Sequence, residues 1–84
     1  MNCYDIMGVI VEDRDDNGPE VQEVFTDFGC IIKVRLGLHN HTEEVCTNEG
    51  FIILQLCGDE KIQKELEKRL NDIEGVMAKR VRIK

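Results

Sequence analysis

The stretch covering residues 31–57 constrains the fold most, because it contains two strand-like segments separated by a polar one. Over residues 31–38, apolar side chains alternate with Lys33, Arg35 and Gly37, which is typical of a strand with one buried face. Residues 50–57 are almost continuously apolar, which is typical of a strand buried on both faces. We therefore predict an antiparallel pair joined by a loop over residues 39–49, with the first strand at the sheet edge and the second at its centre.

Two further segments have the character of strands. Residues 4–11 form another nearly continuous apolar run, so this strand also belongs at the centre of the sheet. We expect Gly8, in the middle of the run, to permit close approach by a helix or by another subunit. Residues 76–84 alternate in part between apolar and basic side chains, as expected of a charged strand at a sheet edge.

Two segments show the periodicity of amphipathic helices. The first is expected to open at Pro19, where a missing N–H is tolerated, and to end at Gly29. The second is expected to open after Asp59, a residue type that caps helices, and to end at Gly75. The apolar stripes consist of Val21, Val24, Phe25 and Phe28 in the first helix and of Ile62, Leu66, Leu70 and Ile73 in the second.

The resulting order of elements is βαββαβ, which predicts an α+β fold of the ferredoxin-like type in a single domain covering residues 1–84. Right-handed crossovers interleave the two βαβ units, so the antiparallel sheet has the strand order 4-1-3-2 with two helices on one face. The apolar pattern agrees independently, because the two strands expected at the centre are the two continuous apolar runs.

The predicted fold leaves one face of the sheet without helices. Both central strands are apolar on their two faces, and an apolar patch of this kind marks an interface. We expect Met7, Val9 and Val11 to form it together with Phe51 and Ile53. The partner would then be the protein itself, as a homodimer or homotetramer that buries this face or extends the sheet edge to edge.

The acidic composition limits the other partners. The chain has 84 residues and a net charge of −6, which argues against bulk attraction to nucleic acid or to anionic lipid. No apolar run reaches the ~20 residues that a membrane span needs, and the N-terminus lacks the basic region of a secretory signal. We therefore predict a cytoplasmic protein with neither a direct nucleic-acid partner nor a membrane partner.

Four cysteines are many for this length, but without a secretory signal they are weak evidence for disulfides. Cys30 and Cys57 stand at strand edges beside apolar runs, and we predict that both are buried thiols. No Cys-x-x-Cys pair occurs, which excludes the common signature of zinc ribbons and metallochaperones.

Short motifs along the chain support a family comparison. They are GVIVEDR at residues 8–14, VRLGL at 34–38 with a following acidic loop, FIIL at 51–54 with a following turn, and GVMAK at 75–79. Through them, nearly the whole chain resembles the small ACT-like proteins known as iron-only hydrogenase system regulators. That family has an ACT-like, ferredoxin-like fold, similar to the sensor domain of nickel-responsive repressors, and is expected to form dimers or tetramers. The resemblance implies a regulatory module associated with a hydrogenase system.

The resemblance also implies a place for an effector. ACT domains bind amino acids near the turn from the first strand to the first helix, and Asn17 and Gly18 occupy that place. Backbone N–H groups at the start of the helix would receive a carboxylate or a phosphate, whereas the preceding acidic residues would oppose an anion. A plain tight turn is the favoured alternative at this position.

A metal site is the alternative function, and it rests on His39, His41 and Cys46. Nickel-responsive sensor domains hold metal through a His-x-His pair in the second strand, but the matching strand positions here are Arg35 and Gly37, so the histidines fall in the loop. Imidazole and thiolate ligands suit Ni²⁺, Zn²⁺ or Fe²⁺. We expect no resident cofactor, with a divalent transition metal as the alternative.

No nucleophile beside a base can be read from the sequence, so we do not expect an enzyme. The leading hypothesis is a non-catalytic, homo-oligomeric regulatory module that binds a small effector or a partner protein. A metal sensor or carrier is the alternative, and a purely structural assembly protein is the third candidate.

Overall fold

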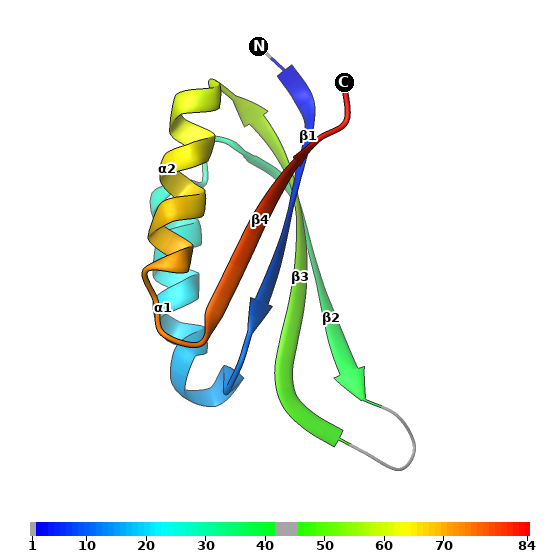
Figure 1. Ribbon diagram of the computed structural model, residues 1–84, viewed down its shortest axis with the longest axis vertical. Coiled ribbons are helices and arrows are strands. Elements are labelled where there is room, and N and C mark those ends of the chain that lie inside the picture. The colour runs from blue at the N-terminus through cyan, green and yellow to red at the C-terminus, as the bar shows by residue number, and fades with distance from the viewer. Residues whose placement is uncertain (1, 42–45) are drawn as a thin grey trace.

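The computed structural model describes residues 2–41 and 46–84 (Figure 1). Its elements follow in the order β1 (Asn2–Val11), α1 (Arg14–Asp27), β2 (Ile32–His41), β3 (Cys46–Gly58), α2 (Glu60–Asn71) and β4 (Val76–Arg82). No helix within this described part is long and apolar enough to cross a membrane.

The four strands form one antiparallel sheet in the order β2-β3-β1-β4, which is the predicted order read from the other edge. β1 and β3 occupy the centre, which confirms the inference from their continuous apolar runs. Both helices cover one face of the sheet, and the described chain leaves the opposite face bare (Figure 1). One face therefore packs against the helices, whereas no element of the described chain packs against the opposite face.

The hydrophobic core lies between the helices and the covered face of the sheet. α1 contributes the predicted stripe of Val21, Val24, Phe25 and Phe28, all buried. In α2, Leu66 and Leu70 are fully buried, whereas Ile62 is 36% exposed and Gln63 is buried beside it in the sequence. The helical periodicity thus identified both core-facing stripes, with Ile62 as the exception.

The oligomer interface predicted from the sequence is wrong in its β1 part. Met7, Val9 and Val11 are 0–2% exposed and belong to the core beneath the helices. The register of β1 and β3 instead places the intervening residues of β1 opposite Phe51 and Ile53. Because directly opposed residues in an antiparallel pair share a face, Phe51 and Ile53 lie on the bare side of the sheet.

α1 begins five residues before the predicted start at Pro19. Asp13 adopts the left-handed conformation with φ 49°, and its carbonyl accepts a hydrogen bond from the backbone N–H of Asn17 at 2.9 Å. Acidic residues in the first turn favour the positive end of the helix, and Pro19 removes a single backbone donor inside it. Asn17 and Gly18 are therefore helical residues and not part of a turn.

β2 and β3 extend further than the sequence suggests. β2 continues to His41 and β3 begins at Cys46, so most of the predicted loop over residues 39–49 is paired strand. In the register, His39 lies opposite Gly50 and His41 lies opposite Cys46. Ladder hydrogen bonds join backbone groups and do not require apolar side chains, which explains strands in a polar stretch. Residues 42–45, which include Glu43 and Glu44, lie outside the described part of the chain.

The prediction of buried thiols is also wrong. Cys57 forms a disulfide with Cys3, and Cys30 is exposed. The disulfide joins the beginning of β1 to the end of β3 across a sequence separation of 54 residues. The antiparallel pairing of the two central strands brings these cysteines together, and no local sequence pattern reveals such a contact.

Candidate functional site

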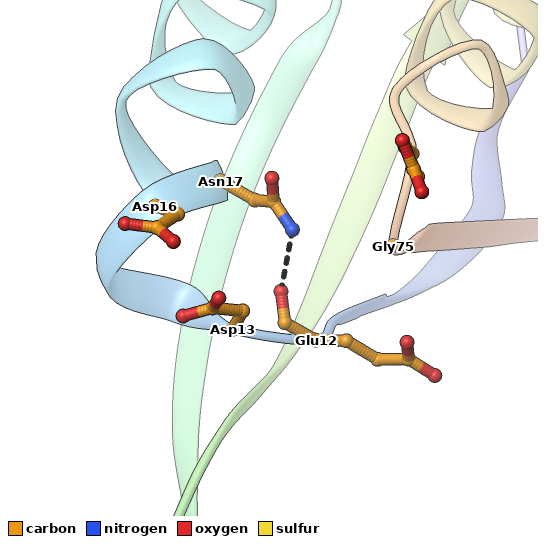
Figure 2. Close-up of a pocket in the computed structure, with 6 residues that line it drawn as sticks. Glu12, Asp13, Asp16, Asn17 and Gly75 are labelled. Carbon is orange, nitrogen blue, oxygen red and sulfur yellow. Dashed lines mark hydrogen bonds between the residues drawn. The ribbon is translucent and has the colours of Figure 1, made fainter.

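Three segments meet at the N-terminal end of α1, namely the end of β1, the first turn of α1 and the turn before β4 (Figure 2). They enclose a pocket with a volume of about 320 Å³, which we call the acidic pocket. It is lined by Glu12, Asp13, Asp16, Asn17, Glu74 and Gly75. The structure thus brings the predicted effector residue Asn17 to a pocket, whereas Gly18 does not line it.

Hydrogen bonds hold these three segments together. The backbone N–H of Glu12 donates to the carbonyl of Gly75 at 2.8 Å, and Nδ2 of Asn17 donates to the carbonyl of Glu12 at 2.7 Å (Figure 2). Gly75 has φ +83°, and a Cβ added there would lie 2.7 Å from Nδ2 of Asn17, so this turn requires glycine. The side-chain N–H of Asn17 is therefore engaged in fixing α1 to β1.

The electrostatics of the acidic pocket are unfavourable for an anion. Four lining residues carry carboxyl groups, and no basic side chain lines the pocket among those that the structure describes, which do not include the side chain of Arg14. A side-chain hydrogen bond with Asp13, followed by the negative charge of Asp13, raises the pKa of Asp16. Both effects indicate crowded negative charge, which opposes the carboxylate or phosphate ligand considered from the sequence.

The face of the sheet without helices, which we call the open face, is the second feature of functional interest. Its apolar members are Ile6, Gly8, Ile10, Val34, Leu36, Phe51, Ile53, Met77 and Val81. Four of them are 44–52% exposed, namely Val34, Leu36, Met77 and Val81. Apolar residues gathered over all four strands form a contiguous patch, which is typical of an interaction surface.

The two arginines of β4, Arg80 and Arg82, are in contrast engaged within the chain. Arg80 donates from Nη2 to Oε1 of Glu60 at 3.1 Å and from Nη1 to Oε1 of Gln63 at 3.2 Å. The hydrogen bond from Arg80, together with the charges of Lys64 and Arg82, lowers the pKa of Glu60. The alternation of basic residues that predicted a charged edge therefore ties β4 to α2.

Asp5 is a buried carboxylate that the sequence analysis missed. It is 0% exposed, and its Oδ1 accepts a hydrogen bond from Nε of Arg82 at 3.3 Å, which raises the pKa of Arg82. Its Oδ2 has no hydrogen-bond partner among the described residues. The sequence did contain one indication of this burial. Asp5 stands two residues before Met7 in β1, so the two side chains point to the same face of the strand. We interpret the pair with Arg82 as a structural tie between the central strand and β4.

The predicted metal ligands lie where β2 ends and β3 begins. His41 and Cys46 are opposed in the register, and His39 precedes His41 by two residues in the same strand. The side chains of all three lie outside the described part of the structure. Among the side chains that are described, no group of three histidine, cysteine or acidic residues could hold a metal ion. The fold therefore brings two of the three predicted ligands together at the level of the backbone.

Comparisons with known proteins show that this chain is similar to a protein of solved structure. No protein-family model and no curated protein match it. It is similar to the uncharacterized protein TM1266 from Thermotoga maritima, with 31% sequence identity and a TM-score of 0.82 over 95% of each chain. The two proteins thus share their fold and a substantial part of their sequence along almost their whole lengths. The chain belongs to the family of this Thermotoga protein.

Proposed function

We propose that the protein is a non-catalytic, homo-oligomeric regulatory module with an ACT-like, ferredoxin-like fold, acting in an iron-only hydrogenase system. In this proposal, the module responds to a small effector or to a partner protein. The hydrogenase association is supported by the family resemblance of the sequence motifs at residues 8–14 and 75–79. The proposed assembly is supported by a separate structural observation.

That observation is the apolar open face. Contact between an exposed apolar patch and water is unfavourable, and burial of the patch against a partner removes that contact. A second copy of the chain offers the same patch, so a two-fold arrangement would cover both faces at once. A domain of this length also buries a limited fraction of its surface alone, so self-association would add stability.

The test of self-association places negative charge on the open face. We expect the Leu36→Glu/Met77→Glu double variant to weaken the dimer at least about a hundredfold, because carboxylates lose hydration in an apolar interface. Analytical ultracentrifugation over a range of concentrations measures this change. Both positions are about half exposed in the single chain, so the fold itself should persist in circular dichroism.

A matched control adds the same charge elsewhere. The Gln22→Glu/Thr26→Glu variant introduces two carboxylates on the exposed side of α1 and should associate as the unmodified protein does. A protein that is monomeric at every concentration, or a Leu36→Glu/Met77→Glu variant that associates normally, would contradict the proposed assembly.

A metal sensor or carrier is the second candidate function, and the pairing of His41 with Cys46 favours it. Strand pairing places opposed residues within about 4.5–5.5 Å at Cα, a separation that two ligands of one metal can share. We expect, on this alternative, stoichiometric Ni²⁺, Zn²⁺ or Fe²⁺ after anaerobic purification. Stabilisation would be about 2.7 kcal/mol at a metal concentration 100 times Kd.

The His39→Ala/His41→Ala variant tests this alternative, because it should lose both the metal and the stabilisation. Elemental analysis and thermal melting give the two readouts. Metal-free protein whose melting temperature does not respond to any of the three ions would exclude the sensor function.

A further inference from the structure

A hollow in the open face indicates what kind of effector the protein could bind. It has a volume of about 240 Å³ and is lined by Gly8, Ile10, Phe51, Met77, Ala78 and Lys79. Apolar side chains thus form most of its surface, and one lysine is its single charged lining residue. The acidic pocket at the start of α1 has the opposite character.

Gly8 leaves room for this hollow. Gly8 is the direct cross-strand partner of Ile53, so a side chain at Gly8 would project from the open face. A Cβ added there would lie 3.5 Å from Cε1 of Phe51, which is an ordinary van der Waals contact. The single chain could therefore accept alanine at this position. A glycine inside a strand also makes that strand less stable. The packing of the single chain does not require this glycine, and a guest in the hollow would use the space that it leaves.

Lys79 supplies a positive charge that has no ion-pair partner among the described side chains. It is exposed and lies directly opposite Gly8 in the β1–β4 register. Its neighbours along β4 on the same face are Met77 and Val81, both apolar. Among the ion pairs of the described residues, none includes Lys79, although the chain carries six more negative than positive charges. An anionic group beside the hollow would provide the missing partner.

We propose that the hollow binds a small carboxylate with an apolar body, such as a single aromatic ring, with the carboxylate paired to Lys79. An apolar cavity of ~150 Å³ is enough to hold benzene, so this hollow has room for one ring with a short acid arm. The inference rests on the proposed regulatory function, since it names the chemical class of the small effector. In the assembly proposed above, the second copy faces the hollow and excludes water from the bound ligand.

The experiment is a titration of the unmodified protein with phenylacetate, followed by ¹H–¹⁵N correlation spectra. We expect the largest shifts at the amides of Gly8, Ile10 and Met77. Phenylacetamide has the same ring without the charge, and it should bind at least about tenfold more weakly, because it lacks a charge-assisted contact. Shifts confined to other parts of the chain, or equal binding of acid and amide, would overturn the proposal.

Two variants separate the charge from the space. Lys79→Met should weaken phenylacetate about tenfold and leave phenylacetamide unchanged, because it removes the cation and keeps the aliphatic stem. Gly8→Ala should weaken both ligands, since the methyl group occupies the hollow. The matched controls are Lys61→Met on the exposed side of α2 and Gly37→Ala, where an added Cβ meets no atom within 4 Å. Unchanged affinities in Gly8→Ala would overturn the assignment of the hollow.

The experiments distinguish a failure of the ligand proposal from a failure of the proposed assembly. A dimer that does not bind phenylacetate overturns the ligand inference and leaves the proposed oligomer in place. A monomer that binds phenylacetate through Gly8 and Lys79 overturns the oligomer and supports the ligand site.

Discussion

Replacing Val9 with aspartate is expected to prevent folding, whereas the same change at the adjacent Ile10 leaves a folded protein. Val9 is 0% exposed beneath the helices, so its replacement would bury an unpaired carboxylate. We expect a loss of about 5 kcal/mol or more, from the uncompensated charge and the lost apolar packing. A chain of this length has a total stability of ~4–13 kcal/mol, at roughly 0.05–0.15 kcal/mol per residue.

Ile10 provides the matched control because it lies on the open face and lines the hollow. Ile10→Asp places its carboxylate toward solvent in the single chain, and a folded but monomeric protein is expected. Circular dichroism and urea unfolding distinguish the two variants, and ultracentrifugation reports the assembly of the second. Unfolding of Ile10→Asp together with folding of Val9→Asp would show that the assignment of the two faces is inverted.

The Cys3→Ser/Cys57→Ser variant should lose about 2–4 kcal/mol of stability, because the disulfide closes a long loop and restricts the unfolded chain. For a domain of this size, that loss corresponds to a melting temperature lower by roughly 10–30 °C. Thermal unfolding followed by circular dichroism measures the difference. Addition of a reducing agent to the unmodified protein should give a similar decrease.

Cys30 supplies the control for the disulfide prediction. Its thiol is exposed and is not part of the bridge, so Cys30→Ser should melt within a few degrees of the unmodified protein. Equal melting temperatures for the oxidised and reduced protein would contradict a stabilising role for the Cys3–Cys57 bond. A large decrease in Cys30→Ser alone would point to a different cysteine pairing.

Much of the fold could be predicted because it depends on patterns that are local in the sequence. The continuous apolar runs identified β1 and β3 as central, and right-handed crossovers then determined the order of the sheet. The stripe from Val21 to Phe28 identified the buried side of α1. Helix boundaries were harder, since the left-handed conformation of Asp13 starts α1 inside a run of acidic residues that resembles a loop.

The candidate sites could be predicted only in part. Asn17 does lie at a pocket, but the carboxyl groups around it come from three separate segments, so the charge of the pocket depends on the fold. The hollow beside Gly8 requires β1, β3 and β4 to be aligned in one register. The histidines and Cys46 were visible as a group, whereas the strand pairing of His41 with Cys46 was not.

The sequence by itself determined the order of the elements, the two central strands, the core-facing sides of the helices and the negative charge of the chain. It did not determine which side of β1 the helices cover, because apolar residues occupy both alternating sets of that strand. That choice, the Cys3–Cys57 bond and the pair of Asp5 with Arg82 were decided by the tertiary structure alone. The physical reason is that each depends on contacts between segments distant in the chain, whose relative register no local periodicity encodes.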